Sequence, residues 1–314
     1  MGFFDRMYYG KAGKKDYTEN DMPKTRMSLF FMVLKDHLFD LIKVNLLQIV
    51  SWLPFIIWTY VNIAAVYNLD VQTILSAENG ALDLLGAISG YLMIWLAGSI
   101  PCLVITGPSS AGAAYIMRNW ARDQHTFLFS DFKDAFKANW KQALGVSAIT
   151  SLMPIVLYTC VTYYGNFART NKFMILPLIL VLSASFVFIL MIPLLYPLIV
   201  GYELKFRYVF KNALLLSVAC LPQMLLARIV TAIPAALLIY AVYAGKSVML
   251  LIMSTYYLAF GFAFSRLVYA SVGNTVFDKY LNPRIEGAVI GQGLRPEELD
   301  DEDDEEDDED NEEE

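Results

Sequence analysis

The sequence predicts an all-α integral membrane protein, a bundle of six transmembrane helices with amphipathic helices at the cytoplasmic interface. Hydrophobic residues make up 57% of the 314 residues and charged residues only 18%, against about 45–50% and about 25% in soluble domains. The apolar residues collect in six blocks, each long enough for the roughly 20 residues that a helix needs to cross a bilayer. Basic residues collect between alternate blocks, as in the cytoplasmic loops of membrane proteins.

The net charge of −7 comes from the C-terminal tail. Residues 297–314 hold 16 of the 31 acidic residues, so the rest of the chain carries 24 basic against 15 acidic residues. A basic body is typical of a membrane protein whose cytoplasmic face lies beside anionic lipid, and no nucleic-acid partner is expected. The composition of 286–314 predicts a disordered acidic tail, because like charges repel and few apolar residues are present.

The chain starts with a basic segment, 1–25, which we expect to be poorly ordered and which lacks the apolar stretch of a cleavable signal peptide. A membrane domain is expected at 26–285. Residues 26–43 place apolar side chains at helical spacing with charges between them, which predicts a helix lying at the membrane interface. The first span is expected at about 44–67, where Trp and Tyr residues fit the aromatic belts of a bilayer protein.

The second span is expected at about 82–106, where Pro101 and the sequence GPSSAG end the apolar block. Residues 108–142 predict interfacial amphipathic helices on the cytoplasmic side. Within them, aromatic rings at i, i+3, i+7 and i+11 form a stripe with charged residues between, as in a helix on a membrane surface. These rings belong to Phe129, Phe132, Phe136 and Trp140.

Four further spans are expected at about 143–165, 173–201, 213–245 and 247–272. The fourth contains three prolines. Because proline removes a helical hydrogen bond and clashes with the preceding turn, they predict a kink or break in that span. They are Pro177, Pro193 and Pro197.

The basic residues predict the orientation. The segments assigned to the cytoplasm hold 20 Lys and Arg residues, those assigned to the outside hold three, and Arg228 lies within the fifth block. This bias, with an even number of spans, predicts that both termini are cytoplasmic.

A weaker pattern recurs at the start of each odd span. LIKVN (41–45), AFKAN (135–139) and VFKN (209–212) each place a Lys and an Asn after apolar residues, and a Pro follows within 9–15 residues. One interpretation is three hairpin repeats, each with an interfacial helix and two spans. The alternative is that these residue types are simply common at membrane interfaces.

The sequence predicts neither an enzyme nor a bound cofactor. The three cysteines lie far apart in apolar segments, and the two histidines, His37 and His125, are isolated. Such spacings match neither a metal site nor a nucleophile–base pair. No catalytic, cofactor-binding or metal-binding residue is therefore predicted.

Arg228 is the first candidate functional residue. An ionisable side chain inside a membrane is by default a functional hypothesis, because placing it there costs at least about 2.5–3.5 kcal/mol. The alternative is that residues 206–227 include another interfacial helix and that Arg228 reaches the lipid headgroups from it. Replacement of Arg228 by Leu distinguishes these two interpretations. It should abolish activity and leave membrane insertion intact if Arg228 is central, and should change nothing if it is not.

Gly107 and Pro108 are the next candidates. They begin a helix at the interface, where free N–H groups can hold an anion or a partner carboxylate. The alternative is a sharp turn with proline in the first helical turn, where its missing N–H costs nothing.

Two segments resemble the YesL family of bacterial multipass membrane proteins. GPSSAGAAYIMR (107–118) is similar to its GPA-x-AALY segment, and DFKDAFKANWKQA (131–143) to its DFFxAFKxNFKQA segment. The resemblance covers about 40–160, with Ser109–Ser110 and Trp140 as departures. The family's recurring positions correspond here to Gly107, Pro108, Phe132, Phe136, Lys137 and Asn139.

The resemblance implies a protein of the bacterial cell membrane, often found with carbohydrate-uptake systems, and no established activity. We therefore expect an accessory or assembly component of ABC-type carbohydrate uptake that is neither the ATPase nor the permease. Its expected partners are the lipid bilayer and sugar transporter subunits. The alternative is a secondary transporter or channel for a small solute that uses broken helices and Arg228. An enzyme acting on lipid or glycan is the weakest hypothesis.

Overall fold

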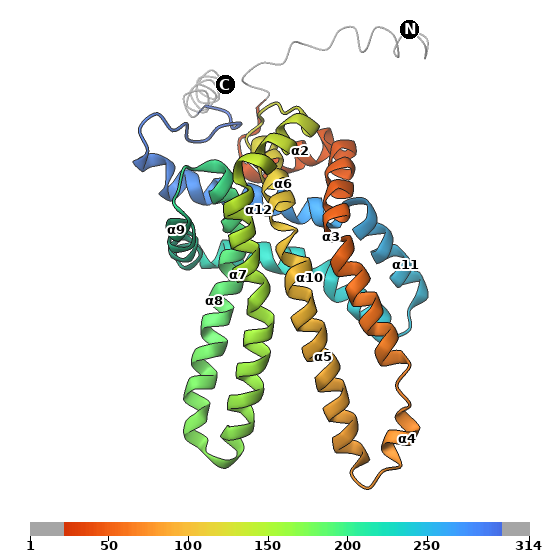
Figure 1. Cartoon of the computed structure of the whole chain (residues 1–314). Helices are drawn as coiled ribbons and strands as arrows, with labels where there is room; N and C mark the ends of the chain where they lie inside the picture. The colour runs from red at the N-terminus through yellow and green to blue at the C-terminus, as the bar shows by residue number, and fades with distance from the viewer. Residues whose placement is uncertain (1–21, 297–314) are drawn as a thin grey trace, which may run out of the picture.

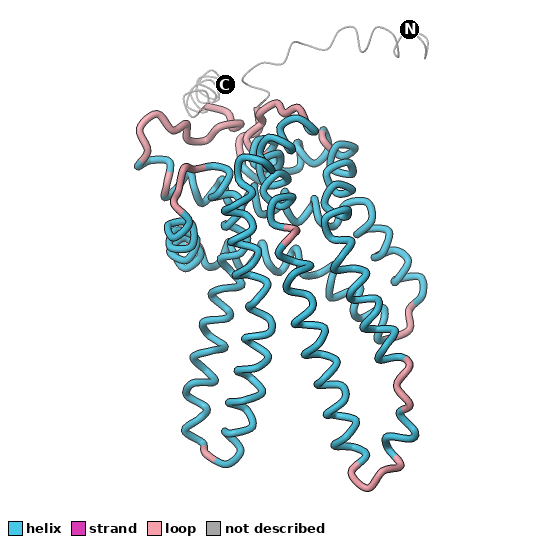
Figure 2. The backbone as a smooth tube through the Cα atoms, viewed as in Figure 1, coloured by secondary structure: helices cyan, strands magenta, loops and turns pink. Residues whose placement is uncertain are grey.

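The computed structural model describes residues 22–296, which are mainly helical and contain no β-strand in this range (Figures 1 and 2). Six helical segments are long and apolar enough to cross a membrane. The predicted class, an all-α membrane protein with six spanning helices, is therefore confirmed.

The elements follow one another in this order: α2 (Arg26–Asp36), α3 (Leu38–Tyr67), α4 (Val71–Leu75), α5 (Gly80–Val104), α6 (Gly107–Trp120), α7 (Leu128–Thr170), η2 (Lys172–Met174), α8 (Ile175–Gly201), α9 (Phe206–Ala219), α10 (Leu221–Tyr243), α11 (Ser247–Tyr256), the π-helical turn η3 (Tyr257–Gly261), α12 (Phe262–Tyr280) and η4 (Asn282–Arg284).

Three antiparallel pairs make the spanning part: α3 with α5, α7 with α8, and α10 with α11 and α12. The loops that join the first two pairs lie at the far end of the molecule from both described chain ends (Figure 1). Many large apolar side chains along these pairs are exposed, among them Leu180 and Ile239. Such an apolar surface suits lipid, where backbone groups must be satisfied within helices.

The packed core lies at the end of the molecule that holds the chain ends, and α6 is its centre. Twelve of the 14 residues of α6 are buried. One core cluster joins α6 to α7, α8, α9, α10 and α12, and a second joins it to α2, α3 and α12. Small residues allow this packing: an added Cβ at Gly107 would lie 2.4 Å from the carbonyl oxygen of Ala143. Close backbone approach through small residues is typical of helix packing in membranes.

The prediction of interfacial helices over 108–142 is wrong for its first part, and its second part is not a separate helix. Residues 107–120 form α6, which lies within the bundle rather than on its surface. Residues 128–142 are the first part of α7, a continuous helix of 43 residues that also forms the third span. Neither Gly nor Pro occurs between Leu128 and Leu144, so the helix continues from the amphipathic segment into the span.

Two other boundaries differ from the prediction. The segment 26–43 is divided at His37, and its second part belongs to α3. The fifth apolar block is divided at Cys220 into α9 and α10, and Pro222 lies in the first turn of α10, where its missing N–H costs no hydrogen bond. The α9 helix is seen nearly end-on while α7 and α8 run down the view, so α9 lies across them (Figure 1).

The prolines of the fourth span do not break it. The α8 helix is uninterrupted from Ile175 to Gly201, although Pro193 and Pro197 lie inside it. The irregular span is the sixth, where η3 widens one turn between α11 and α12.

The predicted N-terminal segment and acidic tail fall mostly on 1–21 and 297–314, outside the described residues. Within the described part, residues near 292 contact the body of the protein. The Gln292 carbonyl oxygen accepts a hydrogen bond from Arg26 at 2.9 Å, and its side chain accepts one from Arg122 at 2.6 Å. Residues 286–296, which the prediction placed in the disordered tail, therefore pack on the body of the protein.

Candidate functional site

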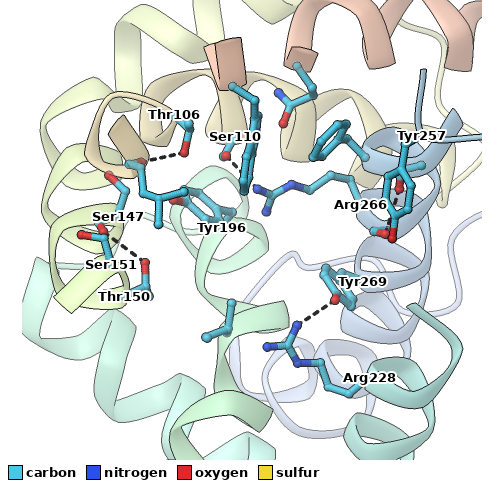
Figure 3. A pocket seen from close by; sticks show the side chains of 17 residues that line it. Thr106, Ser110, Ser147, Thr150, Ser151, Tyr196, Arg228, Tyr257, Arg266 and Tyr269 are labelled. Atoms are coloured by element: carbon cyan, nitrogen blue, oxygen red, sulfur yellow. Dashed lines mark hydrogen bonds between the residues drawn. The ribbon is translucent and has the colours of Figure 1, made fainter. Parts of the chain in front are cut away.

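A cavity of about 320 Å³ lies inside the membrane part, bounded by α3, α5, α6, α7, α8, α10 and the η3–α12 segment. This volume is at the lower end of the range for small-molecule sites, roughly 300–1,000 Å³. Polar side chains from most of these elements face it, as Figure 3 shows. The arginines lie on one side of the view and the hydroxyls of α7 on the other.

Arg266 projects from α12 into this cavity. Its Nη2 donates a hydrogen bond of 2.7 Å to Ser110 Oγ at the start of α6. Its guanidinium also lies over the ring of Tyr196, 4.8 Å from the centroid, in a cation–π contact. These contacts fix the guanidinium but supply no negative charge.

Arg228 reaches the same cavity from α10. Its Nη1 donates a hydrogen bond of 2.9 Å to the Tyr269 hydroxyl, which also lies 2.8 Å from Thr231 Oγ1. The sequence left two interpretations of Arg228 open: a residue inside the bundle, or one that reaches the lipid headgroups beside a separate helix in 206–227. A separate helix, α9, does exist, but Arg228 belongs to the spanning helix α10 and lines the cavity.

Among residues 22–296, no Asp or Glu forms an ion pair with Arg228 or Arg266. Beside them, the Nε1 atom of Trp52 is buried and makes no hydrogen bond in the described part of the chain. Buried donors are nearly always satisfied in folded proteins, so Trp52 Nε1, next to two guanidinium groups, indicates a cavity suited to a ligand that accepts hydrogen bonds.

The facing wall carries hydroxyl groups whose protons are already used. Ser147 Oγ donates to the Val104 carbonyl oxygen at 2.7 Å, and Thr150 Oγ1 donates to that of Val146 at 3.0 Å. Ser151 Oγ and Thr106 Oγ1 likewise donate to Ala148 and Leu103. A hydroxyl that donates once retains lone pairs that accept, so this wall offers acceptors to the cavity.

The residues singled out in 107–142 do not meet at this cavity. Gly107 and Pro108 are buried at the start of α6, where Gly107 packs on α7. Phe132 packs on Gly112, while Phe136 and Lys137 are exposed. Asn139 donates to the Ala135 carbonyl oxygen of its own helix at 3.0 Å. These contacts give Gly107 and Phe132 roles in packing α6 against α7.

Arg266 and Trp52 were missed from the sequence. Arg266 falls inside the predicted limits of the sixth span, 247–272, and lies in α12. A charged residue within an apolar block was the available signal. Trp52 gave no signal, because tryptophan in a span is ordinary.

A third guanidinium, that of Arg118, lies outside the spans, at the end that holds the chain ends. Arg118 of α6 has a buried Nε without a hydrogen-bond partner in the described residues, and its guanidinium lies 5.9 Å from the ring centroid of Tyr202. Burial lowers the pKa of Arg118 and raises the pKa of the Tyr202 hydroxyl. Gly201 makes room for this side chain, since a Cβ there would lie 2.8 Å from Arg118 Nε.

No group of three or more His, Cys, Asp or Glu residues suited to a metal ion occurs in the described range. The three cysteines are free. The cavity itself is lined by two arginines and by several hydroxyl-bearing side chains.

The fold and the cavity define a six-span helical membrane protein with a basic site among its helices. Residues 91–159 match the family described as "Protein of unknown function, DUF624". The matched range covers the end of α5, all of α6 and most of α7, and so includes the hydroxyl wall but neither arginine. No curated protein and no solved structure matches the chain.

Proposed function

We propose that this protein binds a small solute in the cavity between its helices and takes part in moving it across the membrane, as a secondary transporter or channel. One observation carries the proposal: two arginines that form no ion pair within residues 22–296 and a row of hydroxyls face one cavity inside a spanning bundle. Polar residues at such positions are costly and mark substrate paths.

The irregular helices next to the cavity support this function. Tyr257, Gly261 and Phe262, at the two ends of η3, line it. Asn45 of α3 holds this turn by donating to the Tyr257 and Leu258 carbonyl oxygens and accepting from the Phe262 and Ala263 N–H groups. Transporter sites are commonly built at interrupted helices, and π-helical turns often mark functional sites.

Uptake into proteoliposomes tests the proposal. Purified protein is reconstituted and supplied in turn with radiolabelled neutral sugars, sugar acids, phosphate esters and amines. At least one class should enter faster than into protein-free vesicles, and Arg228→Gln should slow that flux at least about tenfold. Arg207→Gln is the matched control, because Arg207 also lies over a tyrosine ring but on α9, away from the cavity. Equal flux with and without protein for every class contradicts the proposal.

The second candidate is the accessory role in ABC-type carbohydrate uptake. Its supporting observation is the amphipathic start of α7, where Phe129, Phe136 and Trp140 are exposed. Apolar rings on this segment suit contact with lipid or with a transporter subunit. Stoichiometric co-purification of sugar-permease subunits in mild detergent, lost on replacement of Phe129 and Trp140 by Ser, supports this role. Purification of the protein alone contradicts it.

We further propose membership of the YesL family and a place in the bacterial cell membrane with both termini in the cytoplasm. The basic residues near the chain ends support that orientation. In a variant without Cys102, Cys160 and Cys220, a cysteine at Glu78 should react with a membrane-impermeant maleimide in intact cells. A cysteine at Asp123 should react only after permeabilisation, and the reverse result contradicts the orientation.

A further inference from the structure

We infer that the cavity binds a hydroxyl-bearing oxyanion: a carboxylate or phosphate group on a molecule that also carries hydroxyls. The inference rests on the proposed solute-binding function and names the chemical class of the solute. It comes from the unequal distribution of donors and acceptors over the two sides of the cavity.

The side that holds the arginines carries three donor groups. The guanidinium groups of Arg228 and Arg266 each retain N–H groups beyond the single hydrogen bond that each makes to a hydroxyl. The buried Trp52 Nε1 has no hydrogen-bond partner in the described range and adds a third donor. A carboxylate or phosphate accepts several hydrogen bonds at once and supplies the negative charge that these two cations lack.

The other side offers acceptors. Thr106, Ser147, Thr150 and Ser151 each donate their proton to a backbone carbonyl, so their free lone pairs accept from a ligand. An alkyl carboxylate has no donor for this wall. A molecule with hydroxyl groups does, and it therefore satisfies both sides.

Two other classes of ligand, cations and neutral polyols, do not suit this cavity. A cation is repelled by the two guanidinium groups, which have no acidic neighbour among residues 22–296. A neutral polyol satisfies the hydroxyl wall but leaves both charges uncompensated inside the bundle, which is the expensive arrangement. A free hydroxy acid and an anionic lipid headgroup share the chemistry that remains.

Isothermal titration calorimetry on the full-length protein in detergent tests the class with three six-carbon probes. Gluconate carries both groups, sorbitol lacks the charge, and hexanoate lacks the hydroxyls. Gluconate should bind at least about tenfold more tightly than either of the others, since each loses a full set of hydrogen bonds. Sorbitol binding as tightly as gluconate overturns the inference while leaving a solute-binding function in place.

Variants separate the two sides of the cavity. Arg228→Gln and Arg266→Gln should each weaken gluconate binding at least about tenfold, while Arg228→Lys, which keeps the charge, should weaken it less. Thr150→Val should weaken gluconate and leave hexanoate unchanged. The matched control is Thr159→Val, because Thr159 makes the same bond to the carbonyl oxygen four residues earlier, at 2.8 Å, but lies outside the cavity. The thermal unfolding temperature of each variant shows whether it is folded.

Competition identifies the source of the anion. Displacement of gluconate by glycerol 3-phosphate indicates a free solute, and displacement only by short-chain phosphatidylglycerol indicates a lipid headgroup; both support the class. Absence of binding by gluconate, glycerol 3-phosphate and short-chain phosphatidylglycerol overturns it. Binding without flux in proteoliposomes retains the oxyanion site and contradicts only the transport proposal.

Discussion

His37 shows, at the scale of single residues, how packing sets the charge of a side chain outside the spans. Its ring is stacked on Trp120, with centroids 4.4 Å apart and planes within 8°. Burial lowers the pKa of His37 from its usual 6.5 and outweighs the opposing attraction of Asp40 and Asp36. The folded protein therefore favours the neutral imidazole.

The first prediction concerns pH. Because the unfolded chain takes up this proton at a higher pH than the folded chain, the free energy of unfolding should fall as the pH drops below about 6.5. The thermal unfolding temperature measured from pH 7.5 to 5 should show this loss, and His37→Phe, which keeps a ring on Trp120, should reduce it. His125→Gln is the control, since His125 is exposed. An equal pH dependence in His37→Phe and the natural protein contradicts the prediction.

Gly107 leads to a second prediction at the residue scale. Its Cα lies against α7 so closely that an added Cβ would be 2.4 Å from a backbone oxygen and 2.5 Å from Ser147 Oγ. Gly107→Ala should therefore push α6 from α7 and lower the free energy of unfolding by about 1–3 kcal/mol. Gly165→Ala, on the same α7 with open space around it, should not destabilise. Equal effects of the two substitutions on thermal unfolding contradict this account.

At the scale of elements, similar sequence patterns have different roles. Asn45 and Asn139 both follow a Lys near the start of an odd span, which is the basis of the repeat hypothesis. Asn45 is fully buried and makes four hydrogen bonds to the η3–α12 junction. Asn139 bonds only within its own helix. A local sequence pattern therefore places an asparagine on a helix but does not predict its hydrogen-bond partners on the neighbouring helix.

This difference predicts unequal costs of substitution. Asn45→Ala should lower the free energy of unfolding by about 2–3 kcal/mol, because it leaves buried backbone groups of the π-helical turn without partners. Asn139→Ala should cost less than about 1 kcal/mol, the value of one local hydrogen bond. Denaturant-induced unfolding in detergent compares the two variants, and similar losses contradict the assignment of Asn45 as the support of η3.

At the scale of the whole molecule, Asp278 joins the two ends of the described chain. Its carboxylate forms an ion pair with Arg26 of α2 and accepts a hydrogen bond from the Gly291 N–H at 3.2 Å. The Arg295 N–H also donates to the Pro23 carbonyl oxygen at 3.2 Å. These contacts attach α2 and the 286–296 segment to α12.

The fourth prediction follows from this junction. Asp278→Asn should lower the free energy of unfolding by about 1–3 kcal/mol, because it leaves a largely buried Arg26 without its charge partner. Limited proteolysis near residues 26 and 292 should accelerate in the same variant. Asp40→Asn is the control, since Asp40 pairs with Lys43 three residues away on an exposed surface and such pairs contribute little. Unchanged proteolysis in Asp278→Asn contradicts the role of the junction.

The sequence by itself determined the class, the six spans and one of the two cavity arginines. It could do so because a bilayer selects helices by length and local hydropathy, both of which are sums over neighbouring residues. The prediction was wrong where the position of a segment depends on distant parts of the chain. Small residues allow α6 to be buried among other helices, and the fifth span begins at Leu221, just before Pro222, so that α9 is a separate helix.

Only the tertiary structure decided that Arg228, Arg266 and Trp52 share one cavity with the hydroxyls of α7. Trp52 and Arg266 are 214 residues apart in the sequence. Each of these side chains could face lipid, a neighbour or the cavity, depending on the rotation of its helix about its own axis. That rotation is set by contacts between helices, through small residues, aromatic rings and the bonds of Asn45. Hydropathy contains no information about such contacts, so the site became visible only when the helices were packed together.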